Sequence, residues 1–168
     1  MKKVTANNKE SQVGGLIIVR AQESDVAEIL HLQRLAYQSE AEIYNNYSIE
    51  PLIQTLEQAT EAFQESFVLK ALVNGKIIGS VRAIEKQNTA YIGKLMVLPN
   101  YQNQGIGKRL LQTIECEFKG RRFELFTGGR SEKNLSLYEK SGYVRFKTEE
   151  FAPELTLIYL EKQAELAG

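Results

Sequence analysis

The sequence predicts a mixed α/β fold, in which a mostly antiparallel sheet of about seven strands carries helices on both faces. The first observation behind this prediction is a β-hairpin, because an Asn-Gly pair at 74–75 joins apolar, β-branched segments at 67–73 and 77–84. The second is a β-α-β unit, in which strands at 91–97 and 123–126 flank an amphipathic helix. Strands connected in this way are parallel, so the sheet is mixed.

The other elements follow from local sequence patterns. Asp25, with Glu28 three residues later, indicates a helix start, Pro51 fits a first helical turn, and Ser131 fits a helix cap. In chain order we predict a strand at 16–19, helices at 25–37 and 51–63, the hairpin, the β-α-β unit with its helix from 104 to 118, a helix at 131–141, and strands at 143–146 and 155–160. Residues 1–15 are expected to form a flexible N-terminal arm, and residues 16–168 a single domain.

Composition and charge exclude several classes of protein. The chain has 168 residues, of which 43% are hydrophobic, enough for one domain with a core. Its 21 basic and 21 acidic residues cancel, so neither nucleic acid nor an anionic membrane is an expected partner. There is no apolar run of about 20 residues and no signal-peptide stretch, so we expect a cytoplasmic protein. With Cys116 as the single cysteine and His31 as the single histidine, neither a disulfide nor a structural metal is expected.

The most informative segment is a glycine-containing turn between the strand at 91–97 and the next helix. Gly105 and Gly107 fall in the first helical turn, where backbone N–H groups have no intrahelical partner and carry partial positive charge. Glycine at an interior helix position lowers stability by up to about 1 kcal/mol relative to alanine, so two of them indicate that a ligand approaches the backbone closely. A pyrophosphate is the anion that best fits such a turn.

Other interpretations of this turn have to be compared. An isolated Gly-x-Gly is more often an ordinary helix start with incidental glycines. A dinucleotide-binding motif does not fit, because its third glycine would fall at Leu110 and seven residues separate Val97 from Gly105. A Walker loop does not fit, because Lys108 is followed by Arg109 instead of Ser or Thr.

The segment Gln102-Asn103-Gln104-Gly105-Ile106-Gly107 resembles the signature of the GNAT superfamily of acetyl-CoA-dependent N-acetyltransferases. That signature is Arg or Gln, two residues, Gly, one residue, and then Gly or Ala. The lead-in from Leu95 to Pro99 and a later Asn134-x-x-x-Tyr138-x-x-x-Gly142-Tyr143 also match the family pattern. The resemblance extends from about Ile17 to Leu160 and implies the GNAT fold, with acetyl-CoA as co-substrate and no metal.

The resemblance also implies which residues bind coenzyme A. The pyrophosphate is expected at Gln102, Asn103, Gln104, Gly105, Ile106 and Gly107, with positive charge nearby from Lys108 and Arg109. Backbone groups of Met96 and Val97 would pair with the pantetheine arm, and Asn134 and Tyr138 would contact that arm. A backbone N–H near Val97, where the family's two parallel strands diverge, is the candidate oxyanion donor.

Acetyl transfer to an amine requires a nitrogen lone pair, stabilisation of an oxyanion and a proton for the departing thiolate. Tyr138 lies at the family's general-acid position, and a phenol with a pKa of about 10 is protonated at neutral pH. The family's direct attack in a ternary complex needs no enzyme nucleophile, so Cys116 is expected to be structural. Relatives often carry an acid where residues 93–94 are Gly-Lys here, which leaves Glu40 and Glu42 as candidate bases, unless the acceptor binds as the neutral amine.

The acceptor site is implied to lie in the segment after the first helix. Residues 38–65 contain six Glu and no Lys or Arg. This charge favours a cationic acceptor, such as a polyamine, a lysine side chain or another small amine, with Tyr44 and Tyr47 as cation–π faces. A solvated acidic helix face accounts for the same pattern, and His31 is likewise expected on a helix surface.

Two functions from different classes remain open at this point. One is an N-acetyltransferase that acts on a small-molecule or peptide amine. The other is a non-catalytic sensor domain that binds acyl-CoA or CoA, which would share the phosphate-binding turn but would not need the proton donor Tyr138. Dimers are common among members of the family, so a homodimer is a candidate assembly.

Overall fold

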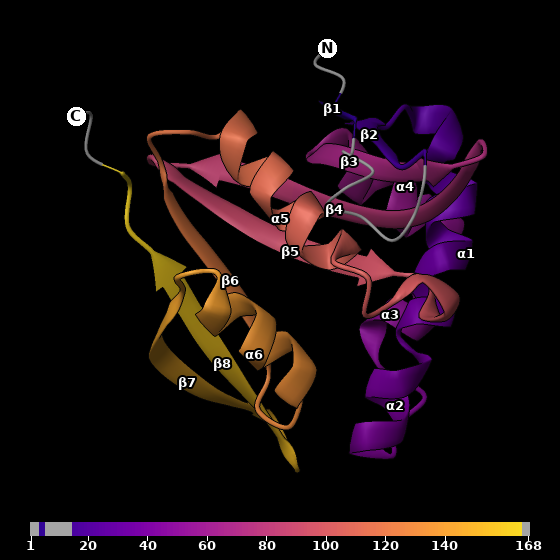
Figure 1. Cartoon of the computed structure of the whole chain (residues 1–168). Coiled ribbons are helices and arrows are strands. Elements are labelled where there is room, and N and C mark those ends of the chain that lie inside the picture. The colour runs from indigo at the N-terminus through magenta and orange to yellow at the C-terminus, as the bar shows by residue number, and fades with distance from the viewer. Residues whose placement is uncertain (1–3, 6–14, 166–168) are drawn as a thin grey trace.

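The computed structural model describes residues 4–5 and 15–165 and confirms the mixed α/β architecture (Figure 1). Within these residues eight strands form one sheet in the order β1-β2-β3-β4-β5-β6-β8-β7, and all neighbours are antiparallel except β5 and β6. The strands are β1 (Val4–Thr5), β2 (Ile17–Arg20), β3 (Phe67–Val73), β4 (Lys76–Lys86), β5 (Thr89–Val97), β6 (Arg122–Gly128), β7 (Val144–Ala152) and β8 (Leu155–Lys162).

Helices cover both faces of the sheet, as the sequence predicts. They are α1 (Val26–Ala36), α2 (Gln38–Tyr44), α3 (Glu50–Ile53), α4 (Leu56–Gln64), α5 (Ile106–Glu117) and α6 (Glu132–Lys140), with short 3-10 turns at Glu23–Asp25 and Pro99–Tyr101. On one face, Ser80 and Arg82 of β4 line a small cavity with residues of α1 and α4. On the other face α5 packs closely, because a Cβ at Gly79 would lie 3.0 Å from Cδ1 of Leu110.

Strand β1 lies inside the segment predicted as a flexible arm. Its two residues pair with β2, Val4 opposite Ile18 and Thr5 opposite Ile17. The rest of the predicted arm up to residue 14 lies outside the described residues. The seven predicted strands are all present, and β1 is added to them at the edge of the sheet.

The helix predicted at 51–63 is two helices, and α2 was not predicted at all. Gln54 has an extended backbone (φ −58°, ψ 131°), which ends α3. Thr55 then caps α4: its side chain accepts from the Gln58 N–H (3.1 Å), and the Gln58 side chain accepts from the Thr55 N–H (3.0 Å). A local capping box therefore overrides the apolar spacing that suggested one continuous helix.

Two predicted caps use their side chains differently. Asp25 accepts from the Gln22 N–H (2.7 Å) and pairs with Lys70 of β3 (2.8 Å), and Glu28 accepts from the Ile77 N–H of β4 (2.9 Å). The helix therefore starts next to Asp25 as predicted, but the two acids attach its start to the sheet and do not bond to each other's backbone.

The parallel pair β5–β6 is short. Only three residue pairs join the strands, Thr89–Arg122, Ala90–Phe123 and Tyr91–Glu124. Beyond them β5 continues to Val97 and β6 to Gly128, and the two strands diverge (Figure 1). The sheet therefore opens into a wedge whose closed end lies at Thr89 and Arg122.

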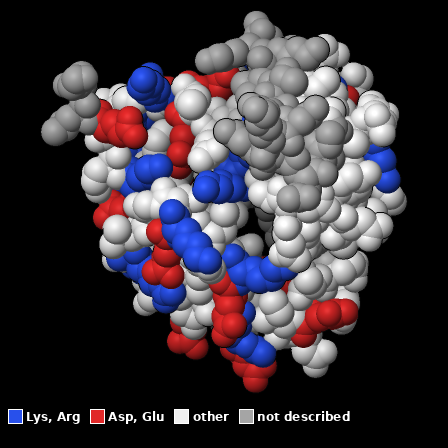
Figure 2. Space-filling model, in the orientation of Figure 1, with Lys and Arg blue, Asp and Glu red and all other residues white. Residues whose placement is uncertain are grey.

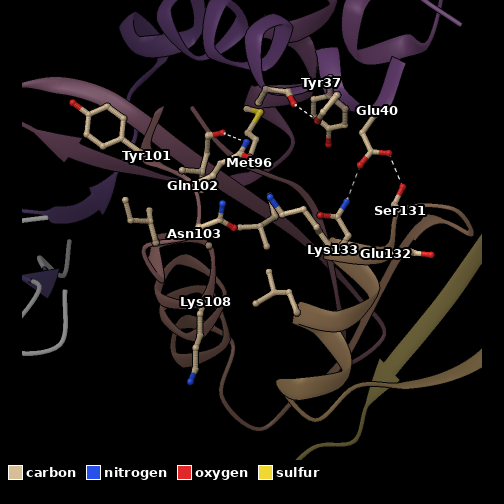
Figure 3. Close-up of a pocket in the computed structure, with 18 of the residues that line it drawn as sticks. Tyr37, Glu40, Met96, Tyr101, Gln102, Asn103, Lys108, Ser131, Glu132 and Lys133 are labelled. Carbon is tan, nitrogen blue, oxygen red and sulfur yellow. Dashed lines mark hydrogen bonds between the residues drawn. The ribbon is translucent and has the colours of Figure 1, made fainter. Parts of the chain in front are cut away.

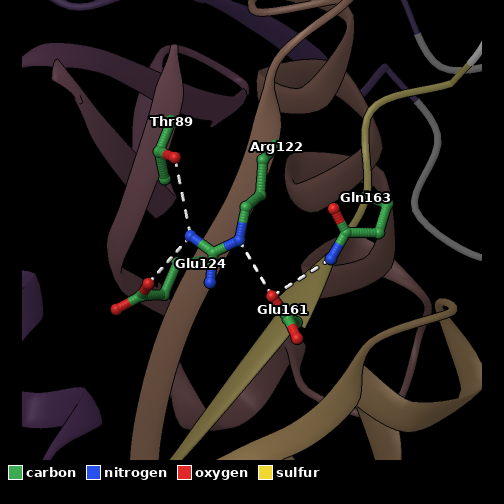
Figure 4. A network of polar contacts seen from close by, with 5 residues as sticks. All are labelled: Thr89, Arg122, Glu124, Glu161 and Gln163. Carbon is green, nitrogen blue, oxygen red and sulfur yellow. Dashed lines mark hydrogen bonds and ion pairs between the residues drawn. The ribbon is translucent and has the colours of Figure 1, made fainter. Parts of the chain in front are cut away.

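An ion-pair network ties the closed end of this wedge (Figure 4). The Arg122 guanidinium donates to Glu124 of its own strand and to Glu161 of β8, both at 2.9 Å, and to the Thr89 hydroxyl of β5 at 3.5 Å. One partly buried side chain thus contacts all three strands that meet there. The two carboxylates raise the pKa of Arg122 against the effect of its burial, so the guanidinium stays charged.

Charge is mixed over the surface. On the face seen in Figure 2, basic and acidic side chains lie next to one another over the part that carries β6, α6, β7 and β8. Among the described residues, no helix is long and apolar enough to cross a membrane.

We predict that Arg122→Gln lowers the free energy of unfolding by about 1 kcal/mol, because it removes two charge-assisted hydrogen bonds made by a side chain that is only 25% exposed. Urea denaturation measures this loss. Arg145→Gln is the matched control, since its pair with Glu139 is about half exposed and should contribute much less. Equal losses in the two variants would contradict a special role for the Arg122 network.

Candidate active site

A cavity of about 560 Å³ occupies the open end of the wedge (Figure 3). Its walls come from four parts of the chain: residues 36–43 of α1 and α2, the end of β5 at 95–97, the turn at 101–108, and the start of α6 at 130–137. The predicted phosphate turn and the predicted acceptor segment therefore face the same space. From the sequence, the family resemblance was the only reason to expect these two segments at one site.

Val97 directs its backbone toward this cavity. The Leu98 N–H donates to the Ile78 carbonyl (2.8 Å), so strand alternation turns the N–H and C=O of Val97 away from β4, toward the gap left by β6. The Gln102 side chain donates to the Val97 carbonyl (2.9 Å), and the N–H remains directed at the cavity. The same alternation turns the Met96 backbone toward β4. Of the two residues predicted to pair through their backbones, Val97 has that geometry, whereas Met96 lines the cavity without it.

The start of α5 has no side-chain cap among the described residues. Gly105 is the N-cap with a left-handed backbone (φ +81°), and the first intrahelical bond runs from the Arg109 N–H to the Gly105 carbonyl (3.1 Å). The N–H groups of residues 106–108 precede that bond and therefore have no partner within the helix. A Cβ at Gly107 would lie 3.6 Å from Leu137, an ordinary contact, so the protein's own packing does not require this glycine.

Most of the predicted coenzyme-binding residues line the cavity. These are Met96, Val97, Gln102, Asn103, Gly105, Ile106, Gly107, Lys108 and Asn134. Gln104, Arg109 and Tyr138 do not line it. The Gln104 side chain instead donates to the Asn100 carbonyl (3.4 Å), Arg109 lies one turn into α5, and Tyr138 is buried next to the lining residue Leu137. Lys108 is exposed, and its side chain extends away from Tyr37 and Glu40 (Figure 3).

Helix α2 reaches across the cavity to α6 through a polar network. The Glu40 carboxylate accepts from the Ser131 hydroxyl (2.5 Å) and from the Asn134 side-chain amide (3.2 Å). Asn134 also donates to the Thr127 hydroxyl (3.2 Å), so both of its amide hydrogens have protein partners. Ser131 starts α6, as predicted, but its hydroxyl contacts Glu40 and does not cap the helix.

Tyr44 forms the second part of this bridge. Its hydroxyl lies 3.2 Å from the Ser131 hydroxyl and accepts from the Arg130 N–H (2.9 Å). The phenol also lies directly on Gly128, where a Cβ would approach its oxygen to 2.0 Å. The Arg130 guanidinium stacks over the ring, 5.4 Å from its centroid. The face of Tyr44 proposed for a cationic acceptor is therefore occupied by a cation of the chain itself, while Tyr47 is 54% exposed and lies outside the cavity.

The six glutamates of the acidic segment have different surroundings. Glu40 alone among them lines the cavity, and Glu50 pairs with Lys94 of β5. Glu42 is exposed and does not line the cavity. Of the two candidate bases, only Glu40 therefore has contact with the cavity.

Two tyrosines flank Glu40. Tyr37, between α1 and α2, lines the cavity, and Tyr138, from α6, is buried beside it. Burial raises the pKa of Tyr138 above its ordinary value, and the negative charge of Glu40 raises it further; the pKa of Tyr37 is raised for the same reasons. Both phenols are therefore protonated at neutral pH. Among the described residues the Tyr138 hydroxyl has no hydrogen-bond partner.

Sequence reasoning missed the cavity role of Tyr37, Ser131 and Arg130. Tyr37 follows the apolar spacing of α1 and therefore resembles an ordinary core residue. Ser131 and Arg130 precede α6, and their use depends on α2, which the sequence did not predict. In the described part of the chain, no group of three or more His, Cys, Asp or Glu could hold a metal ion.

Comparison with known proteins identifies the class to which this fold and cavity belong. A family model described as "Acetyltransferase (GNAT) family" matches residues 26–143, well over half of the chain. The protein therefore belongs to the acetyltransferase (GNAT) family. This match includes α1, the glycine-containing turn at 102–107 and the whole of α6.

Individual relatives are more distant. The chain is 30% identical over 144 residues to UPF0157 protein YqkA of Bacillus subtilis (strain 168), a match that covers 83% of this chain but only 41% of that protein. The chain thus spans about two fifths of the length of this curated relative.

Solved structures show the same fold at low sequence identity. The PaiA N-acetyltransferase of Thermoplasma acidophilum, in complex with coenzyme A, is 19% identical with a TM-score of 0.71, covering 86% of this chain and 98% of that chain. YncA, a putative acetyltransferase from Salmonella typhimurium with acetyl-CoA, is 15% identical with a TM-score of 0.73, covering 92% and 97%.

The two glycines of the turn should respond differently to alanine. We expect Gly105→Ala to lower the free energy of unfolding by about 1 kcal/mol, because its φ of +81° is strained for any residue with a Cβ. Gly107→Ala should be neutral or stabilise by about 0.5 kcal/mol, because its Cβ has room and alanine favours the helix. Urea denaturation of both variants checks this, and a neutral Gly105→Ala would show that the left-handed cap is not maintained in solution.

Proposed function

We propose that the protein is an N-acetyltransferase that transfers the acetyl group of acetyl-CoA to a primary amine in a ternary complex. One observation carries the proposal: the diverging strands leave the Val97 N–H directed at a cavity that also receives the uncapped N–H groups of residues 106–108. This arrangement suits an elongated ligand with a pyrophosphate at one end and a thioester at the other.

The chain's residues have distinct roles in the proposed complex. The amides of residues 106–108 bind the pyrophosphate, with Lys108 adding positive charge at the rim. The Val97 N–H faces the arm of the coenzyme and the thioester carbonyl. Asn134 can accept a hydrogen bond from that arm through its carbonyl oxygen, but donating one requires its contact with Glu40 to break.

The proposed reaction conserves atoms and charge. The lone pair of the amine forms a bond to the thioester carbonyl carbon, and the oxyanion that develops accepts from the Val97 N–H. The C–S bond then breaks, and the thiolate takes the Tyr138 proton. The amine loses its proton to Glu40, directly or through water. Amide and free thiol are the products, and a proton that passes from Glu40 to Tyr138 through water returns both side chains to their starting states.

A thiol-release assay tests this function. Acetyl-CoA is incubated with the full chain and a panel of amines, and calorimetry with CoA provides an independent measure of cofactor binding. We expect CoA to bind and free thiol to appear only when an accepted amine is present. Absence of CoA binding would refute the proposal, whereas binding without turnover of any amine would favour the CoA-binding sensor.

Tyr138→Phe tests the proton donor. We expect kcat to fall about 100-fold, because general-acid catalysis typically contributes at least that much, while the Kd for CoA stays within about twofold. Tyr37→Phe is the matched control, since it removes a second phenol close to Glu40 whose pKa is also raised. Full activity in Tyr138→Phe, or a larger loss in Tyr37→Phe, would show that Tyr138 is not the donor.

A further inference from the structure

Two basic side chains lie side by side on the sheet next to the active-site cavity. Arg82 of β4 pairs in register with Gly93 of β5, and Lys94 follows on β5 with a left-handed backbone (φ +49°). The register of the two strands shifts between Ser80 and Arg82 at this point. This bulge places Lys94 and Arg82 together on the face covered by α1.

A second cavity of about 40 Å³ separates these cations from α1 and α4. The space is sufficient for a few water molecules or one carboxylate group. Met96 lines both this cavity and the large one, so one residue of β5 separates the two spaces. Tyr37 connects them as well, because it lines the large cavity and lies 5.5 Å, from ring centroid to Nζ, from Lys94.

Around the small cavity the two cations, Arg82 and Lys94, outnumber the one acid that acts on both of them, Glu50. Lys94 forms an ion pair with Glu50, and its side chain is only 13% exposed. Arg82 has no hydrogen bond or ion pair with any described residue, although Glu50 acts on its charge from a distance. Burial lowers the pKa of both cations. Two partly desolvated positive charges therefore share one carboxylate, and an additional anion would compensate the excess.

We propose that Arg82, supported by Lys94, binds a carboxylate of the acceptor, so that the acceptor is a small amino acid-like molecule with one amine and one carboxylate. This proposal rests on the N-acetyltransferase function above. The negative charge of Glu40 raises the pKa of Tyr37, and the positive charge of Arg82 lowers it, so both side chains lie close enough to Tyr37 to influence its hydroxyl. An acceptor that spans Tyr37 would therefore direct its amine toward Glu40 and its carboxylate toward Arg82.

The charge balance favours a carboxylate over other groups. After Glu50 is counted, one positive charge remains, which matches a monovalent carboxylate better than a divalent phosphate. The guanidinium also offers a planar pair of donors that suits two carboxylate oxygens. A polyamine would bring further positive charge next to Arg82 and Lys94, which already exceed their one partner Glu50.

A panel of matched acceptors tests the proposal on the wild-type chain. The panel contains the common amino acids, the carboxamide of each, phosphoethanolamine, putrescine and spermidine, with thiol release from acetyl-CoA as the readout. We expect an amino acid to be the best acceptor and its carboxamide to have a KM at least about tenfold higher, with a smaller change in kcat. If putrescine, spermidine, phosphoethanolamine or a carboxamide is the best acceptor, the proposal is wrong.

Variants of Arg82 assign the effect to this residue. Arg82→Gln should raise the KM for the amino acid about tenfold or more and leave the KM for its carboxamide nearly unchanged, whereas Arg82→Lys should retain part of the preference. Arg145→Gln, which alters an exposed ion pair, should change neither value. An undiminished preference in Arg82→Gln would overturn the assignment, and if that variant does not fold, Arg82→Lys and the acid–amide comparison still decide.

A binding measurement separates this proposal from the proposed function. If no amine is turned over, N-acetyl transfer fails, and calorimetry of the CoA-loaded protein with the same amino acids and carboxamides then decides the carboxylate site. Binding of an amino acid that is lost with its carboxamide and in Arg82→Gln supports the site. Absence of any such difference refutes it.

Discussion

The central constraint on this structure is that β5 and β6 pair over only three residues and then diverge. Backbone N–H and C=O groups away from water need partners, so a strand that loses its neighbour must satisfy them in another way. Here the Gln102 side chain donates a hydrogen bond to the Val97 carbonyl, and the Val97 N–H is directed at the cavity. The Arg122 network limits the divergence by tying the strands at their other end. The position of the cavity therefore follows from where pairing stops.

The two sides of the wedge are joined again at the open end, mainly by polar contacts and by the packing of Tyr44 on Gly128. Helix α2 buries only Ala41, and its link to α6 consists of the Glu40, Tyr44 and Ser131 hydrogen bonds. A bridge with so little buried apolar surface opens at lower cost than the core of the sheet. This matters because Asn134 is held by the same bridge, so a ligand that takes over the Asn134 amide competes directly with Glu40.

Local signals predicted most of the fold. The Asn-Gly hairpin and the β-α-β unit depend on neighbouring residues, and both are present. The sequence did not predict contacts between side chains and distant parts of the chain. Asp25 and Glu28 have the spacing of a helix cap, but they bond to the sheet through Lys70 and the Ile77 N–H. Helix α2 is bonded to residues about 90 positions later, as Glu40 is to Ser131. The turn at 102–107 was singled out because glycines are costly in a helix, and it lines the large cavity. Tyr37 carries no such signal.

The acidic segment shows why charge counted along a sequence is a poor guide to charge in a site. Its Glu50 forms an ion pair with Lys94, and its Glu40 accepts two hydrogen bonds, whereas the cations Arg82 and Lys94 line the small cavity beside α1. Lys94 also stands where members of the family often carry an acid. In the proposed complex Lys94 stays paired with Glu50, and the acceptor's own carboxylate lies between its amine and Arg82. The two cations therefore act only weakly on the pKa of the amine, and removal of the amine proton is left to Glu40.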